Sequence, residues 1–579
     1  MPSGARAGSD PYDGDALPPR VEAKHRPCRD ICCLVFFLLA VAANIAIGAM
    51  SLTMVKDAPA LAEDFNSCVS RSGSPQNQFD VNEVRRGDAQ ARADLQAAAA
   101  SLSLDGISSH PGLLAGLGAA AVAVAAVWVF LLYRFTKCMV WTTLLFSVFL
   151  VAAVGAYFLA VVPNGLEVGL IYLALAALQL AFLLCLRQNI NMAAGLISLA
   201  MRALRDFPSL ILAAIAINVF VLLVYVAELV MALGAAANVE FGAVSGQSLL
   251  DGRRYVTSTV LNLPSGTSVQ RGEDYCVSQL TTLAMATVVM SVVMLFWVTA
   301  TLEAIRMAIA STVFGVFYYY APDDPDKPGC PVCSATTWAF SVQLGTHVVS
   351  GMVLAIIDAL RRMARQGSTS CIGAIIRCIV LMLLSCFEQL TRFLVVVTGL
   401  TGLSFWDSAK RTMMVMREAF FDGYITSAIT VRILRLSGFV FAMVFSIVAW
   451  AGVDPDTFGQ LWPAILVIMV GIYSPIFGIV LAVLASSYLD GMIADDQGRP
   501  ISISGPLAGL FFGSVAHAIL LFMEQLILDL VDSAFVCFAI DTFNGIISPR
   551  GEVVHRFMGA NFGDQLACEV GAREQGVRK

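Results

Sequence analysis

The residues of this chain that could bind a charged ligand gather in one apolar stretch, residues 281–320. They are the carboxylate of Glu303 near the middle of the stretch, the aromatic side chain of Trp297 before it, and those of Tyr318 and Tyr319 after it. Aromatic ring faces beside a carboxylate form the combination that binds a quaternary ammonium group. The stretch therefore contains candidate ligands for a small organic cation. The alternative is a buried ion pair between Glu303 and Arg306, with the aromatic residues anchoring the stretch at a membrane interface.

The length of this stretch allows two structures. Forty residues in one helix span about 60 Å, whereas the hydrocarbon core of a bilayer is about 30 Å thick. The stretch is therefore either one long helix that extends beyond the membrane or two segments broken near the middle. Glu303 and Arg306 lie at that middle, and a charge near the bilayer centre costs about 2.5 kcal/mol or more. Such charges persist where they face a partner or a polar cavity.

The composition of the whole chain places these residues in a membrane. The 579 residues are 58% hydrophobic and only 13% charged, whereas a soluble chain has about 25% charged residues. We therefore predict an all-α polytopic membrane protein with about 10 transmembrane helices, or 11 if an insert near the C-terminus adds a crossing. The formal net charge of −6 argues against a nucleic-acid partner.

The apolar runs divide the chain into three regions. We expect a cytoplasmic N-terminal tail (1–30), a transmembrane domain (31–545) with outer loops at 56–111 and 234–275, and a C-terminal tail (546–579). The basic turn RFTK joins the runs 113–133 and 138–162 and belongs inside, as does the amphipathic linker that follows residue 186. Further apolar runs are predicted at 168–186, 207–233, 340–360, 371–399, 431–450, 462–484 and 505–530.

The positive-inside rule does not decide how often the central stretch crosses. One crossing places Arg361, Arg362 and Arg365 outside, whereas two crossings place Lys410 and Arg411 outside. Both alternatives stay open at this point.

Cys68 and Cys276 are the only cysteines that this topology places in outer loops. In an oxidising compartment they could form a disulfide that ties the two loops together, although the sequence does not fix the distance between them. The CxxC pair at Cys330 and Cys333 lacks the second pair of ligands that a zinc site needs. We therefore expect no metal and no cofactor.

Other titratable residues in the apolar runs extend the candidate site. Glu228 and Asp532 are alternative counter-charges for a cation, because Arg306 could neutralise Glu303. His347 and His517 are candidates for proton coupling, since imidazole titrates near neutral pH, and the alternative is a hydrogen bond between helices. Enzyme motifs are weak: there is no Walker A loop, and DGMIADDQGR resembles a phosphotransferase signature only at its beginning. We expect no enzymatic activity.

Segments in order along nearly the whole chain resemble the choline transporter-like family. They include RPCRDICCLVFFLLAVAANIAIG, LRQNINMAAGLISLAMRAL, LFWVTATLEAIRMAIASTVFGVFYYYA, QLGTHVVSGMVLAIIDALRR, FWDSAKRTMMVMR, WPAILVIMVGIY and VDSAFVCFAID. The resemblance implies about ten spans, cytoplasmic termini, a large first outer loop, and carriage of choline or ethanolamine. This chain departs from the family at Glu303 and Arg306, and by roughly forty extra residues between the last two segments.

The resemblance leads to a functional expectation. The chain should be a carrier of choline or a related small amine such as ethanolamine, working by alternating access in the plasma membrane, with an organellar membrane as the alternative location. A non-transporting or channel-like membrane protein on the same scaffold is the alternative function. The expected partners are the small cation and the lipid bilayer.

Overall fold

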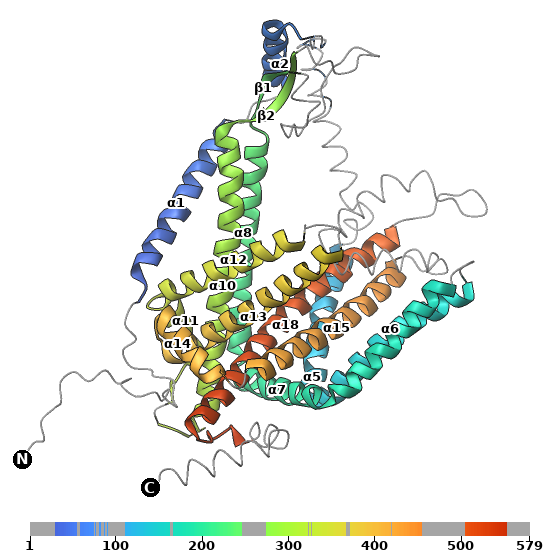
Figure 1. The fold of residues 1–579 in the computed structure, drawn as a ribbon, viewed down its shortest axis with the longest axis vertical. Helices are drawn as coiled ribbons and strands as arrows, with labels where there is room; N and C mark the ends of the chain where they lie inside the picture. Colours follow the sequence, from blue (N-terminus) through green and yellow to red (C-terminus); the bar gives the residue numbers. More distant parts are fainter. Residues whose placement is uncertain are drawn as a thin grey trace, which may run out of the picture. The chain divides into compact units, whose positions relative to one another are not determined.

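The structure, a computed structural model, describes most of the chain (Figure 1). Most of the two tails and the predicted run 462–484, with the DGMIADDQGR segment after it, lie outside the described residues. The described residues are 29–54, 58–74, 76, 80, 82, 86, 90, 111–161, 166–245, 274–321, 323–325, 327–365, 371–417, 420–453 and 504–552.

The chain forms two compact units. The first unit consists of Met1–Asp30, Pro111–Asn218 and Glu303–Lys579, and the second of Ile31–His110 and Val219–Leu302. The described elements are α1 (Ile31–Thr53), α2 (Ala58–Ser72), α5 (Pro111–Val161), α6 (Leu166–Cys185), α7 (Arg187–Asp206), α8 (Ser209–Ala236), β1 (Val239–Ser245), β2 (Asp274–Leu280), α10 (Thr282–Tyr319), α11 (Pro331–Phe340), α12 (Leu344–Arg365), α13 (Cys371–Thr401), α14 (Phe405–Met416), α15 (Phe420–Val453) and α18 (Ser504–Asn544).

The helices confirm the prediction of an all-α polytopic membrane protein. Among the described residues, seven helices are long and apolar enough to cross a membrane, or eight if α6 and α7, bent by 69°, form one span. The exact number of crossings stays a prediction. Helix α5 combines two predicted spans, and its backbone departs from helical geometry at Phe135, inside the RFTK turn. Two strands, β1 and β2, occupy the edges of the expected outer loop 234–275.

The central stretch is one helix. Helix α10 contains 38 residues without a break, so the alternative with two crossings is wrong. Its second half packs closely against α13, where Thr312 donates a hydrogen bond to the carbonyl oxygen of Gly399 at 2.7 Å. A Cβ atom on Gly399 would lie 2.8 Å from the carbonyl oxygen of Ala308. Glycine at this position therefore permits the close approach of the two helices.

Helices α15 and α18 pack antiparallel along their length in the first unit (Figure 1). Gly423, near the start of α15, lies against Phe535 of α18, and Gly438 lies against Leu520 and Glu524. The end of α18 therefore lies beside the start of α15. The end of α15 and the start of α18 therefore lie on the same side of the unit, whatever the path of residues 454–503.

Helix α7 lies between α6 and α8 in the chain and is amphipathic. Its apolar side is buried against α5, α15 and α18, while Arg202 and Arg205 are exposed on the other side. The second half of α5 lies along α6, with Gly155 and Gly169 in close contact. This part of the first unit agrees with the predicted linker between two spans.

In the second unit, α1 and α8 are joined by buried polar contacts. Asn44 of α1 donates to the Glu228 carboxylate at 2.8 Å. Asn238, just after α8, donates to the carbonyl oxygen of Ser51 at 2.6 Å. The buried Asn44 amide gives one oxygen of the Glu228 carboxylate a hydrogen bond without adding a second charge. Because a shift of either helix would leave these buried groups without partners, the contacts fix the register of α1 and α8.

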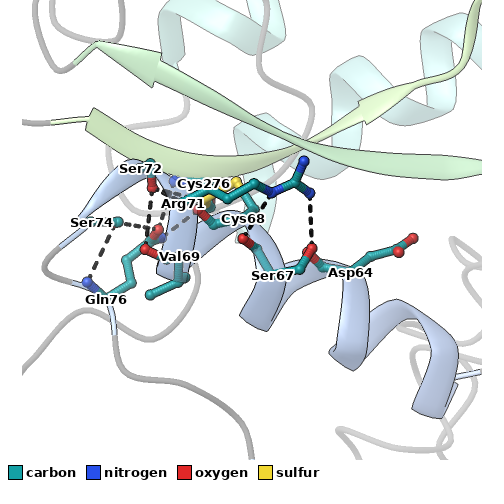
Figure 2. The surroundings of a disulfide bond; sticks show 9 residues. All are labelled: Asp64, Ser67, Cys68, Val69, Arg71, Ser72, Ser74, Gln76 and Cys276. Atoms are coloured by element: carbon teal, nitrogen blue, oxygen red, sulfur yellow. Dashed lines mark hydrogen bonds between the residues drawn. A yellow bond between two sulfur atoms is a disulfide. The ribbon is translucent and has the colours of Figure 1, made fainter.

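The outer part of the second unit is held together by a disulfide between Cys68 of α2 and Cys276 of β2, shown in Figure 2. The strands β1 and β2 are antiparallel, and Ala243 faces Cys276. Gln76 accepts a hydrogen bond from the Cys276 amide at 2.7 Å and donates to its carbonyl oxygen at 3.2 Å. The two cysteines are 208 residues apart in the chain, so the disulfide joins the two expected outer loops.

Replacing Cys68 with serine should expose one additional thiol, that of Cys276, and should destabilise the second unit by about 2–4 kcal/mol, since the disulfide closes a long loop. Labelling of intact cells with a membrane-impermeant maleimide, with and without reduction, measures the thiol, and heating before size-exclusion chromatography measures stability.

Cys138→Ser is the matched control, because Cys138 is a free exposed cysteine of α5. Equal labelling of the wild type and the Cys68→Ser variant without reduction would contradict the disulfide.

Candidate functional site

Two arginines and two aspartates form a charged cluster inside the first unit. The Arg306 Nε of α10 donates to the Asp529 Oδ2 of α18 at 3.0 Å, and the Arg392 Nη2 of α13 donates to the Asp529 Oδ1 at 3.2 Å. The Asp529 side chain is completely buried. Asp529 therefore lies between two guanidinium groups from two other helices. We call Arg306, Arg392, Asp529 and Asp532 the charged cluster.

Asp532 extends the cluster by one turn of α18. Its carboxylate accepts hydrogen bonds from Arg392 Nε at 3.0 Å, from Ser427 of α15 at 2.9 Å and from Gln389 of α13 at 3.3 Å. Side chains three residues apart on a helix share one face, so α18 presents both aspartates to α13, and α13 presents both of its donors. Each charged side chain of the cluster is therefore paired with an opposite charge from a helix far away in the sequence.

A small cavity adjoins the cluster. Its volume is about 70 Å³, and it is lined by polar and charged residues from four helices, Glu303, Arg306, Arg392, Arg435, Glu524 and Gln525, together with Val431, Leu434, Leu521 and Leu528. The Glu524 side chain is buried, and neither carboxylate oxygen has a hydrogen-bond partner among the described residues. One of these oxygens lies directly against the backbone of Gly438.

The charges around the cavity do not balance. Arg306, Arg392 and Arg435 contribute three positive charges, whereas Glu303, Glu524 and the two cluster aspartates contribute four negative charges when all are ionised. The nearby Glu388 is paired with Arg361. With all of these groups ionised, the described residues of the site carry one negative charge in excess, which a single monovalent cation would neutralise.

The predicted aromatic cage does not assemble. Trp297 and Tyr318 lie 21 residues apart on the unbroken α10, a separation of about 32 Å along the helix axis. Trp297 contacts the rings of Phe36 and Phe37 of α1, with ring centroids 5.9 Å and 5.1 Å away. The three aromatic candidates therefore cannot enclose one ligand.

The two tyrosines contact α18 instead. The Tyr318 hydroxyl donates to Asp541 at 3.0 Å, and the Tyr319 hydroxyl lies 3.5 Å from the carbonyl oxygen of Cys537. Asp541 also accepts hydrogen bonds from Ser548, which follows α18. These tyrosines tie the ends of α10 and α18 together.

Among the ion pairs of the described residues, Arg306 is paired with Asp529 and not, as the alternative from the sequence had it, with Glu303. Asp532 is already neutralised by Arg392, and Glu228 accepts a hydrogen bond from Asn44 in the second unit. Of the predicted counter-charges, Glu303 is the one that lines the cavity.

The two predicted histidines lie apart from the cavity lining. His347 is buried near the start of α12. His517 of α18 is buried with its ring edge-on to Phe439, the ring centroids being 6.4 Å apart. Among the described residues, no group of three side chains could bind a metal ion.

Sequence reasoning missed the roles of Arg392, Arg435, Glu524 and Asp529. Each lies in an apolar run, and charged residues within membrane spans are the signal that could have identified them. They come from three helices, α13, α15 and α18, and the sequence of one helix does not identify the helix that faces it.

The sequence pattern of a family described as plasma-membrane choline transporter matches residues 170–542 of this chain. The matched region begins in α6 and ends within α18, so it includes the charged cluster and the cavity. No curated protein matches the chain.

Replacing Asp529 with asparagine should destabilise the first unit by about 3–5 kcal/mol, because Arg306 and Arg392 would keep buried charges with too few partners. The loss should appear as a lower temperature at which the purified protein disappears from the monodisperse size-exclusion peak.

The double variant Arg306→Met/Asp529→Asn should recover part of this stability, since it removes one charge of each sign and leaves the pair of Arg392 and Asp532. A double variant that is less stable than either single variant would contradict the ion-pair interpretation.

Proposed function

Since the chain belongs to the choline transporter-like family, we propose that it carries choline, or a closely related amine such as ethanolamine, and binds it at the cavity beside the charged cluster. The family places the chain in the plasma membrane and gives it a transporter role. The substrate, the binding residues and the alternating-access mechanism are our proposal.

One observation carries this proposal: the buried Glu524 carboxylate has no hydrogen-bond partner among the described residues. An unpaired charge is costly in a membrane interior, so its presence in a cavity points to a partner that comes and goes. Glu303 lines the same cavity, and the lining together with Asp529 and Asp532 carries one excess negative charge when all these groups are ionised. A permanent monocation such as choline has the charge that this site lacks.

The size of the cavity supports an alternating-access mechanism. A volume of about 70 Å³ has room for a few water molecules. A substrate with three N-methyl groups needs more space, so the helices that line the cavity must separate to admit it. The lining residues contain no aromatic side chain, so we assign recognition to charge rather than to an aromatic cage.

The cavity also gives a reason to prefer a carrier over a channel. The lining guanidinium and carboxylate groups come from α10, α13, α15 and α18, and Asp529 and Asp532 link α18 to the others by ion pairs and hydrogen bonds. A continuous pore through this region would have to break buried ion pairs. Saturable, competable uptake supports a carrier, whereas current without saturation would support the channel-like alternative.

The Glu524→Gln and Glu303→Gln variants should take up labelled choline at least tenfold more slowly than the wild type, at matched surface expression. Each replacement removes a negative charge from the cavity while keeping the side-chain size. Uptake in cells, with and without excess unlabelled choline or ethanolamine, measures the effect and ranks the two substrates.

Glu240→Gln is the matched control, since Glu240 is exposed on β1 in the second unit. Full competable uptake in both cavity variants would sink the assigned site, and no uptake of either amine by the wild type would sink the substrate.

A second variant tests the position of the Glu524 carboxylate. A methyl group on residue 438 would meet the Glu524 Oε1 atom, so Gly438→Ala should displace the carboxylate and reduce choline uptake severalfold. Alanine is otherwise favoured over glycine within a helix by about 0.5–1 kcal/mol, so thermal stability should change little.

The Gly118→Ala variant is the control, because nothing lies within 4 Å of the added methyl group there. Unchanged choline uptake in Gly438→Ala would show that the carboxylate need not occupy its present position.

A further inference from the structure

Two neighbouring hollows lie where the turn of α5 meets α7 in the first unit. The larger, of about 610 Å³, is lined by Tyr133–Cys138 of α5 and by Ala194, Gly195, Ser198, Leu199 and Arg202 of α7. The smaller, of about 540 Å³, shares Tyr133, Leu199 and Arg202 with it and adds Arg205, Asp206, Phe317, Pro549 and Arg550. We call the two together the basic hollow.

The charge of the basic hollow is strongly positive. Its lining contains five cationic side chains, Arg134, Lys137, Arg202, Arg205 and Arg550, and one carboxylate, that of Asp206. The Arg550 guanidinium pairs with Asp206 at 2.9 Å and lies over the ring of Phe317. The one acid of the lining is therefore already paired.

The remaining arginines face the hollow without acidic partners. Arg205 donates to the Tyr133 hydroxyl, and its guanidinium lies over the Tyr133 ring. Arg134 lies over the ring of Phe135. Neither these two nor Arg202 forms an ion pair with a carboxylate of the described residues, and all three are exposed. Guanidinium groups arranged in this way match the oxygen atoms of a phosphate.

The basic residues of the hollow themselves favour the cytoplasmic side. Loops and linkers rich in lysine and arginine at the ends of membrane spans lie inside, and Arg134, Lys137, Arg202 and Arg205 gather at the turn of α5 and on α7. The inner leaflet contains anionic lipids.

An apolar surface adjoins the basic hollow on α5. The side chains of Val127, Phe130 and Phe135 are 51%, 59% and 50% exposed. Phe135 is at the bend of α5, and Val127 and Phe130 lie in the turns just before it. Acyl chains cover such a surface in a bilayer. A ligand that fills the hollow with phosphate groups and covers the adjacent surface with hydrocarbon is a phospholipid.

We propose that the basic hollow binds the phosphate groups of an anionic phospholipid headgroup from the inner leaflet, with Arg134 and Arg202 as the principal contacts. The basic hollow shares no lining residue with the cavity beside the charged cluster, so the proposal does not rest on the site proposed for choline.

The test uses the full chain, purified in an uncharged detergent and titrated with dioctanoyl phosphatidylinositol 4,5-bisphosphate while native mass spectrometry counts bound lipid. The wild type should bind saturably, and the Arg134→Gln/Arg202→Gln variant at least tenfold more weakly. Arg187→Gln is the matched control, because Arg187 is an exposed residue of α7 outside the hollow. It should bind like the wild type.

Two arms with the wild type distinguish the source of the phosphate and do not depend on the variant folding. Dioctanoyl phosphatidylcholine should bind at least tenfold more weakly, since its headgroup has no net charge. Soluble inositol 1,4,5-trisphosphate should also bind more weakly, because it lacks acyl chains. Equal binding of phosphatidylcholine, or unchanged binding in the double variant, would overturn the proposal. Equal binding of the trisphosphate would overturn the lipid as the source.

Discussion

The pairing of one buried aspartate with two arginines constrains the first unit more than any other contact. Asp529 is completely buried, and moving a lone carboxylate into such a place would cost several kcal/mol. Arg306 and Arg392 remove that cost only if α10, α13 and α18 keep their register. Ser427 adds α15 through Asp532. Four helices are thereby tied at one level of the unit.

Small residues allow the helices to come close enough for these contacts. Gly399 brings α13 against α10, and Gly423 and Gly438 bring α15 against α18. Lipid supplies no hydrophobic force between helices, so close packing and interhelical polar contacts decide which helices associate. At Gly438 the absence of a side chain leaves room for the Glu524 carboxylate, which lines the cavity. The same glycine therefore permits both the close packing of α15 on α18 and the position of this carboxylate.

The second unit is stabilised by hydrogen bonds to amides and by a disulfide. Its membrane-facing helices are joined by amides that contact a carboxylate and backbone carbonyls, and its outer part by a disulfide between α2 and β2. The buried helices of the unit need a partner for every polar group, and these amides supply them. The same unit contains Trp297, whose ring is occupied by contacts with α1.

The sequence by itself determined the class, most of the helices and the family. Hydropathy is a local property, so it identified spans such as 371–399 within one or two residues of α13, and it placed the bend of α5 in the RFTK turn. It also selected Glu303, which lines the cavity. Only the tertiary structure decided the partners. Arg306 pairs with Asp529, 223 residues away, rather than with Glu303 three residues away, and Tyr318 contacts Asp541 rather than a ligand. The physical reason is that the spacing of charges on one helix defines the face they share, whereas the helix opposite that face depends on how all the helices pack.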